Sequence, residues 1–280
     1  MFGEFLIFAT KIMPKLLTCP NCGHTRSWSV RRHHRKCKRC RKEWSPKNHY
    51  PVDGLRLTKK EWLRMIDTFL RDGSIKAVSR ECHVSINTSY KAVLRIRIAM
   101  YLDAPELFMG ICEADETYVG GAWKNKKIHI RKLGAKRGRG TPKQAIFGIA
   151  QRKPGQVRVW LTRDTKSKTL DPLICSVTCK GSSIFTDGRK GYRKLFKYGY
   201  LHDWVDHDAG EYVRGIVHTQ TIDGFWGKLK THLDSIGGIR KERLHLFVAE
   251  YQWRYNFRHL DRKKQTEKIY KLLTKFGGRS

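Results

Sequence analysis

The stretch HTQTIDGFWGKLK, residues 218–230, decides how this 280-residue chain is expected to fold. Asp223 and Lys230 lie seven residues apart, close to two helical turns, so both should project from the same flank of a helix. An acid and a base beside a buried face indicate either an ordinary surface pair or part of a catalytic site. Apolar residues recur at helical spacing and predict one apolar stripe, made of Ile222, Phe225, Trp226, Leu229 and Leu233.

The sequence on both sides of this helix predicts a mixed sheet with helices packed on it, an α/β fold. A further amphipathic helix follows, with Leu244, Phe247, Val248, Tyr251 and Tyr255 facing inward. Residues 198–217 have no clear pattern. Strands are predicted at 111–119, 144–150, 156–162 and 182–188, and helices at 167–179 and near 190–196.

Acidic residues are scarce, 25 against 58 lysines and arginines, so Asp115 in the first strand and Asp187 at the end of the fourth are conspicuous. Ligands of α/β sheets gather at strand ends, where Asp187 should lie. With Asp223, these acids could supply the oxygen ligands that Mg²⁺ or Mn²⁺ prefers. Two such ions, about 3.5–4 Å apart, can bridge a scissile phosphate.

The sequence leaves alternatives for two of these acids. Strand alternation puts Glu116 on the face opposite to Asp115 but leaves Glu113 on the same face, so periodicity cannot choose between Glu113 and Asp115. Three acids of the unpatterned region could each take the place of Asp223. They are Asp203, Asp206 and Asp208.

Two C-x-x-C pairs near the start of the chain, Cys19 with Cys22 and Cys37 with Cys40, predict a structural zinc ribbon. Four thiolates complete a tetrahedral shell around one Zn²⁺, although His33 or His34 could ligate instead. So small a unit has almost no core, so the metal would supply much of its folding free energy. The ribbon is either a structural cap or a contact to DNA.

Residues 55–102 predict three short helices. Thr58 and Glu61 form a capping box, Gly73 ends the first helix, and Ser74 begins the second. A tight break at residues 83–84 precedes a third helix, which starts at Ser85 or Asn87. This arrangement is typical of a helix-turn-helix domain, with a plain three-helix bundle as the alternative. The third helix carries cations that favour DNA, namely Lys91, Arg95 and Arg97.

A net charge of +33, spread over the whole length, makes nucleic acid the first partner to expect. The glycine-rich basic segment 120–143 is either a solvated charge run or a DNA clamp, and we favour the clamp. No apolar run is long enough to cross a bilayer, and the start does not resemble a signal peptide. The C-x-x-C pattern fits a reducing compartment, so we expect a cytoplasmic protein without a membrane partner.

The sequence contains four longer blocks, namely ADETYVGG (114–121), FTDGRKGYRKL (185–195), HTQTIDGFWGKLK (218–230) and EYQWRYNFR (250–258). These blocks resemble the ISXO-like DDE transposases of prokaryotic insertion sequences. The likeness runs from about residue 17 to 258 and includes the ribbon and the helices ahead of the blocks. The family commonly has Asn and Glu where this chain has Gln220 and Asp223, and the shorter Asp reaches less far from the helix.

The resemblance implies a ribonuclease-H-like mixed sheet with flanking helices, preceded by the zinc ribbon and the helix-turn-helix domain. It maps a metal-binding triad onto Asp115, Asp187 and Asp223, and the downstream basic residue onto Lys230. These residues would use two Mg²⁺ ions to cut the transposon strand with water and to join the freed 3′-hydroxyl to target DNA. The expected partners are double-stranded DNA, as transposon ends and target, and further copies of the chain in a homo-oligomer on DNA. The protein would then be associated with the nucleoid of a prokaryote.

The expected divisions of the chain follow from these assignments. Two other functions stay open: a catalytically decayed transposase or DNA-binding regulator, and a ribonuclease-H-like nuclease or resolvase that only hydrolyses. The divisions are a lead-in (1–16), the zinc ribbon (17–46), the helix-turn-helix domain (55–103), the catalytic domain (108–260) and a basic tail (261–280).

Overall fold

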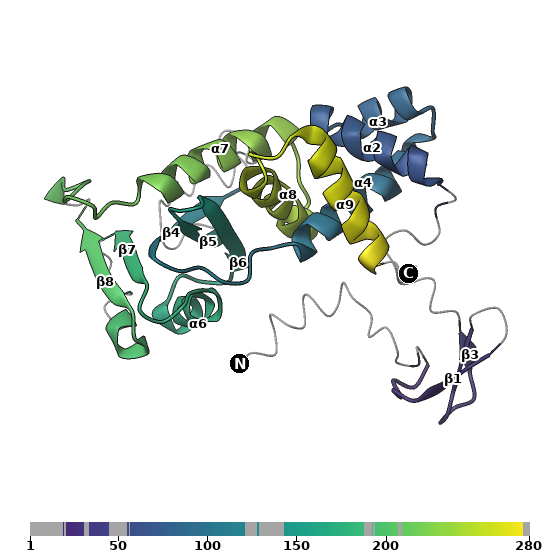
Figure 1. The fold of residues 1–280 in the computed structure, drawn as a ribbon, viewed down its shortest axis with the longest axis horizontal. Helices are drawn as coiled ribbons and strands as arrows, with labels where there is room; N and C mark the ends of the chain where they lie inside the picture. Colours follow the sequence, from purple (N-terminus) through teal and green to yellow (C-terminus); the bar gives the residue numbers. More distant parts are fainter. Residues whose placement is uncertain are drawn as a thin grey trace. The chain divides into compact units, whose positions relative to one another are not determined.

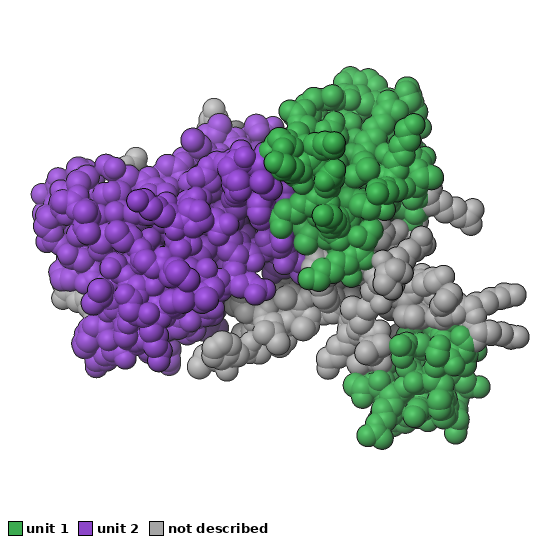
Figure 2. Space-filling view, in the orientation of Figure 1, with its two compact units in different colours: residues 1–99, 261–280 green, residues 100–260 purple. Residues whose placement is uncertain are grey.

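A computed structural model describes two compact units of this chain, which Figure 2 colours separately. One contains residues 1–99 with 261–280, and the other residues 100–260. The lead-in and nearly all of the basic segment 120–143 lie outside the described residues. No helix in the described part is long and apolar enough to cross a membrane. The described residues are 19, 21–30, 34–44, 55, 57–120, 128, 143–187, 192, 194–206 and 209–276.

The cysteine-rich segment forms a small antiparallel sheet in the order β1-β2-β3. Its strands are β1 (Ser27–Ser29), β2 (Arg35–Cys37) and β3 (Glu43–Trp44). Its buried cluster contains Cys19, Cys37 and Trp44, with Cys22 and Cys40 packed against them. An apolar core this small cannot offset the conformational entropy of ordering the segment, so a further source of stability is required.

Three helices follow where the sequence predicts them, namely α2 (Lys59–Asp72), α3 (Ile75–Cys82) and α4 (Ile86–Leu102). Both halves of the capping box at Thr58 and Glu61 are present, and the Ser74 hydroxyl accepts the amide of Ala77 at the start of α3. The hydroxyl of Ser85 accepts the amide of Thr88, so Ser85 rather than Asn87 caps α4.

The segment predicted as a basic tail contains a helix that was not predicted, α9 (Arg262–Phe276). It belongs to the same compact unit as α2 and contacts that helix, and its Ile269 and Leu273 are fully buried. The apolar stripe of this helix is narrow and is hard to recognise in the sequence, because many lysines occupy the other faces of the helix.

The second unit is built on a five-stranded sheet in the order β6-β5-β4-β7-β8. Its first three strands along the chain are antiparallel neighbours, whereas β4-β7 and β7-β8 are parallel. Strand β8 lies in the region that has no clear sequence pattern, because it is short and carries His202 and Asp203 among its five residues. The strands are β4 (Ile111–Val119), β5 (Gln144–Gln151), β6 (Gln156–Thr162), β7 (Ser183–Asp187) and β8 (Leu201–Val205).

Helices cover both faces of this sheet, as Figure 1 shows, with α6 (Ser167–Val177) on one side and α7 (Gln220–Ile236) with α8 (Leu244–Asn256) on the other. On the α6 face, Phe147 and Ile149 of β5 pack with Leu170 and Ile174. Ile146 and Ala150 of β5, which point to the opposite face, join the core under α7 and α8. Short 3₁₀ turns precede β8 (Leu195–Tyr198) and α8 (Lys241–Arg243).

The predicted stripe of α7 is the side of the helix that faces the sheet, since all five of its apolar residues are buried. Helix α8 covers the edge strand β6 with two side-chain amides. Asn256 exchanges hydrogen bonds of 2.7 and 2.8 Å with the backbone of Val157, and Gln252 accepts the amide of Val159 at 2.8 Å. These bonds satisfy backbone groups of the edge strand β6, which could otherwise pair with a strand of another chain.

Candidate active site

Three carboxylates meet at the carboxyl end of β7. Asp115, Glu116 and Asp187 each offer an oxygen, and the three oxygens all lie within 4.8 Å of one another. The strand register brings them together, because the parallel pairing of β4 with β7 ends at Ala114 opposite Thr186. The next residue on each strand is an aspartate, so two acids 72 positions apart (187 − 115) become neighbours.

Glu116 is the member of this group that the sequence analysis placed on the other face. Its position on β4 does follow strand alternation, since its neighbours Cys112 and Ala114 belong to the core under α6. Its carboxylate nevertheless reaches the same place as those of Asp115 and Asp187. Beyond Ala114 no residue of β7 pairs with β4, so side chains from both faces can meet at that open edge.

Tyr192 was not singled out from the sequence, yet it borders the carboxylates. It is buried at 2% exposure, and burial raises its pKa well above the usual value. The negative charges of Glu116, Asp115 and Asp187 raise this pKa further. The phenol therefore stays protonated and presents a hydroxyl beside three acids. Its place in the block FTDGRKGYRKL is the only sequence signal that could have indicated it.

Helix α7 contacts this group through Trp226, whose indole N–H donates to Asp115 Oδ2 at 3.0 Å. The ring lies over Gly148 of β5, the residue paired with Asp115 across the antiparallel ladder. A Cβ atom at Gly148 would come within 2.6 Å of Trp226 Cη2, so only glycine leaves room for the indole. Trp226 is 4% exposed and packs in the core, as the sequence indicated.

Asp223 and Lys230 are both exposed on α7, two turns apart as predicted. The Asp223 carboxylate accepts the Thr219 hydroxyl at 2.9 Å and is not among the three clustered acids. Of the alternatives, Asp203 is bonded to Arg214 at 2.5 Å, and Asp206 accepts the backbone amide of Ala209. Neither joins the carboxylate group, and Asp208 lies outside the described residues.

The structure separates Glu113 from Asp115, which strand periodicity could not do. Glu113 is fully buried, and its carboxylate accepts the backbone amides of Thr221 and Ile222 at 2.7 and 3.0 Å. These are amides of the first turn of α7, which have no partner within the helix. Glu113 therefore caps α7, and Asp115 is the acid that joins the carboxylate group.

The four ribbon cysteines form the second group that could hold a metal in the described part of the chain. The Cys19 and Cys40 sulfurs lie 3.4 Å apart, and those of Cys22 and Cys37 lie 3.6 Å apart. Sulfurs around a tetrahedral Zn²⁺ with bonds of about 2.3 Å would be about 3.8 Å apart. The amides of Arg39 and Cys40 donate to Cys37 Sγ, which stabilises a thiolate. This donor set fits one Zn²⁺.

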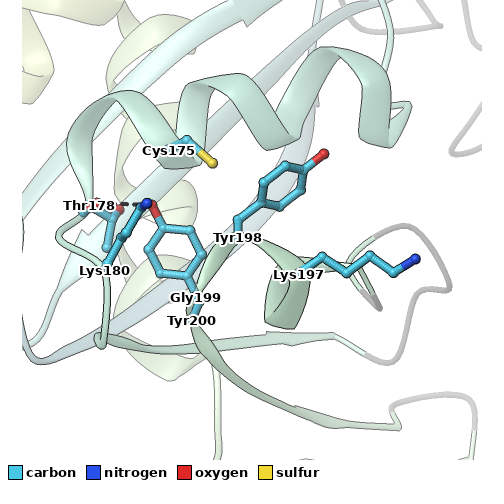
Figure 3. Close-up of a pocket in the computed structure, with 7 residues that line it drawn as sticks. All are labelled: Cys175, Thr178, Lys180, Lys197, Tyr198, Gly199 and Tyr200. Carbon is cyan, nitrogen blue, oxygen red and sulfur yellow. Dashed lines mark hydrogen bonds between the residues drawn. The ribbon is translucent and has the colours of Figure 1, made fainter.

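The acidic group likewise fits a hard divalent cation, because it offers only carboxylate oxygens. Three carboxylates this close repel one another, so a bound cation would relieve a cost that the protein carries alone. A separate pocket of about 520 Å³ lies beside the end of α6. Figure 3 shows its lining, with Cys175, Lys197 and Tyr198 around it and Tyr200 bonded to the Thr178 carbonyl. None of the clustered acids lines it.

The second unit is thus an α/β domain that gathers a carboxylate group at one edge of a mixed sheet. The family described as the ISXO2-like transposase domain matches residues 108–256, more than half of the chain and nearly all of this unit. The protein therefore belongs to the ISXO2-like transposase family of insertion sequences.

Two relatives agree with this assignment. The "uncharacterized protein in transposable element ISH50" of Halobacterium salinarum is 28% identical over 246 residues, which cover 85% of this chain and 82% of the relative. An "uncharacterized transposase-like protein" of Haemophilus influenzae is 29% identical over 93 residues, 33% of this chain and 75% of that protein.

Two solved structures show weak overall likeness. One is a simian T-cell lymphotropic virus intasome in complex with PP2A regulatory subunit B56 gamma, with a TM-score of 0.34 and 13% identity over 71% of this chain and 69% of the other. The other is a pre-cleavage Mos1 transpososome, with a TM-score of 0.24 and 9% identity over 81% and 82%. Values this low carry no argument about this protein.

Proposed function

We propose that this chain is a DDE-type transposase, which binds the ends of its insertion sequence, cuts them by metal-dependent hydrolysis and joins them to target DNA. The observation that carries the proposal is the meeting of Asp115 and Asp187 at the end of β7. The membership in a transposase family and the net charge of +33 support it independently.

The order and directions of the strands support a ribonuclease-H-like fold for this domain. Along the chain, three antiparallel strands (β4, β5, β6) are followed by a helix (α6) and then by two strands parallel to β4 (β7, β8). In this arrangement the first strand is central and the fourth lies beside it, so the acids that the two strands carry come to one edge.

Asp115 and Asp187 would hold two Mg²⁺ or Mn²⁺ ions, with Asp223 as the third ligand residue. When bound, such a pair activates the attacking water or 3′-hydroxyl and stabilises the leaving oxygen. Glu116, whose carboxylate lies in the same group, would share in holding the ions. Lys230, exposed two turns beyond Asp223 on α7, would bind a DNA phosphate as a point charge.

Residues 55–103 would bind DNA as a helix-turn-helix domain, with the N-terminal turns of α4 in the major groove. Asn87 and Lys91 are exposed there. Arg97, which the sequence analysis also assigned to DNA, is instead 7% exposed and lies over the Phe69 ring at 5.3 Å. Its charge is used inside the helical unit, so Arg97 is removed from the proposed DNA surface.

The zinc ribbon would add a second contact to DNA, and cutting two ends together would require a homo-oligomer of the chain on DNA. Such a protein would act at the nucleoid of a prokaryote. One observation favours a second function, a DNA-binding regulator derived from a transposase: the Asp223 carboxylate is absent from the group formed by the other acids. A chain without a working third ligand would bind transposon ends without cutting them.

A cleavage assay tests the proposal. The full chain is incubated with a supercoiled plasmid that carries both ends of its element, in Mg²⁺ or Mn²⁺. We expect nicked and joined products from the wild type, and at least a roughly 100-fold loss in Asp115→Asn and Asp187→Asn with DNA binding retained. Asp203→Asn is the matched control, since it removes the same charge from the same sheet outside the group. Binding without cleavage by the wild type would establish the regulator instead.

A further inference from the structure

Helix α7 is held to the sheet by a buried carboxylate at its first turn. Glu113 has 0% exposure, and both of its oxygens are occupied. Oε2 accepts the amides of Thr221 and Ile222, while Oε1 accepts the Thr221 hydroxyl at 2.8 Å. A negative group at this end of a helix is also favoured by the helix dipole.

Arg152 neutralises this carboxylate and ties down the segment that leads into the helix. Its Nε donates to Glu113 Oε1 at 2.7 Å, and its terminal nitrogens donate to the carbonyls of Ile216 at 2.7 Å and His218 at 2.9 Å. The guanidinium also lies 5.1 Å from the centre of the Phe185 ring on β7. One side chain at the end of β5 thus links β4, β7 and the entry to α7.

Glu113 and Asp115 grip α7 at two points from the same face of β4. They are two residues apart on the strand, hence about 7 Å apart. The amide of Ile222 and the indole of Trp226 that they bind are four residues apart, which spans about 6 Å of helix. The strand and helix spacings match, so these two contacts fix both the position and the rotation of α7. Asp223 lies between them in the sequence of that helix.

We infer that Glu113 and Arg152 are positioning residues for the metal site, because they set the rotation of α7, the helix that carries Asp223. The inference rests on the proposed function, since it assumes that Asp223 contributes to metal binding. Glu113 itself touches no metal in this scheme, as its oxygens are used by α7 and Arg152.

Two variants weaken the contacts of Glu113 and Arg152 with α7 without removing a side chain. Glu113→Gln keeps the shape but loses the charge that Arg152 and the helix amides require. Arg152→Lys keeps the charge but cannot reach the carboxylate and both carbonyls together. The matched control is Glu250→Gln on α8, another buried glutamate, 1% exposed, that pairs with an arginine (Arg254, 3.0 Å). The Glu250→Gln change should destabilise the same unit, but the pair that it breaks lies within α8 and not at the start of α7.

The test uses the full chain at a temperature well below its unfolding transition. Hydrogen exchange of residues 218–226 and Mn²⁺ binding, followed by electron paramagnetic resonance, are measured for each variant. We expect exchange at Thr221 and Ile222 to rise at least tenfold, and Mn²⁺ affinity to fall at least tenfold, in Glu113→Gln and Arg152→Lys but not in Glu250→Gln. Arg152→Lys keeps the test available if Glu113→Gln does not fold.

A second comparison separates positioning from general stability. Asp223→Asn should weaken Mn²⁺ binding in the wild-type background but have little further effect in Glu113→Gln, because the contacts of Glu113 with α7 are already lost. Unchanged Mn²⁺ affinity in folded Glu113→Gln and Arg152→Lys, or an equal effect of Asp223→Asn in both backgrounds, would overturn the inference alone. Wild-type protein that binds no Mn²⁺ would refute the proposed function, and the inference with it.

Discussion

Replacing Gly148 with alanine is expected to disturb the acidic site without changing any acid. The new Cβ would stand 2.6 Å from Cη2 and 2.7 Å from Cζ2 of Trp226, and 3.0 Å from Val159 Cγ1. Carbon atoms in ordinary contact are about 3.5–4.0 Å apart, so the indole must move by about 1 Å. The indole N–H would then lose its 3.0 Å bond to Asp115.

The expected cost follows from three contributions. Overpacking a buried site costs about 1–3 kcal/mol, and a lost hydrogen bond to a charged group costs about 1.5–3 kcal/mol. The lower conformational entropy of unfolded alanine returns about 0.5–1 kcal/mol. The sum is a destabilisation of about 2–5 kcal/mol. For a unit of this size, that lowers the melting temperature by about 5–15 °C.

Thermal unfolding followed by tryptophan fluorescence measures this effect. Gly224→Ala on α7 is the matched control, since nothing lies within 4 Å of a Cβ there and alanine favours a helix interior, so its stability should rise slightly. Trp226→Phe removes the atoms that clash, and in that background Gly148→Ala should cost less by at least about 1 kcal/mol. The reasoning fails if Gly148→Ala melts within about 2 °C of the wild type, or costs as much in the Trp226→Phe background as in the wild type.

Three further outcomes are expected. Burial raises the pKa of Asp171, which is 5% exposed, to about 6. The folded state therefore favours the neutral carboxyl, and the wild type loses stability as the pH rises from about 4 to above 6. In denaturant titrations, Asp171→Asn should be about 1–2 kcal/mol more stable than the wild type at pH 8 and equally stable near pH 4. Asp223→Glu should preserve or raise cleavage, because its carboxylate reaches further from α7, and complete loss in the plasmid assay would show that the residue is wrongly mapped. The double change Cys19→Ser with Cys40→Ser should remove one equivalent of zinc and unfold residues 19–44, and unchanged metal content by mass spectrometry would contradict the zinc site.

Much of the fold could be predicted because its signals are local. The stripe on α7, the capping box at Thr58 and the first strands each depend on residues within one or two turns or one strand length. Strand β8 and helix α9 could not be predicted in this way, because they lack a clear local signal. Strand β8 is only five residues long and α9 is rich in lysine, so their local signals are weak and their packing partners decide the strand and the helix there.

By itself, the sequence determined which acids were available, the two pairs of cysteines, the charge that favours nucleic acid, and the resemblance that names the family. Only the tertiary structure decided between Glu113 and Asp115, since both face α7 and the choice depends on where the first turn of that helix meets β4. It also brought the Glu116 carboxylate into the acidic group, although strand alternation places this residue on the other face, because β4 extends beyond its pairing with β7. Such contacts join residues far apart in the chain, and strand register and helix docking, which no short stretch encodes, set their distances.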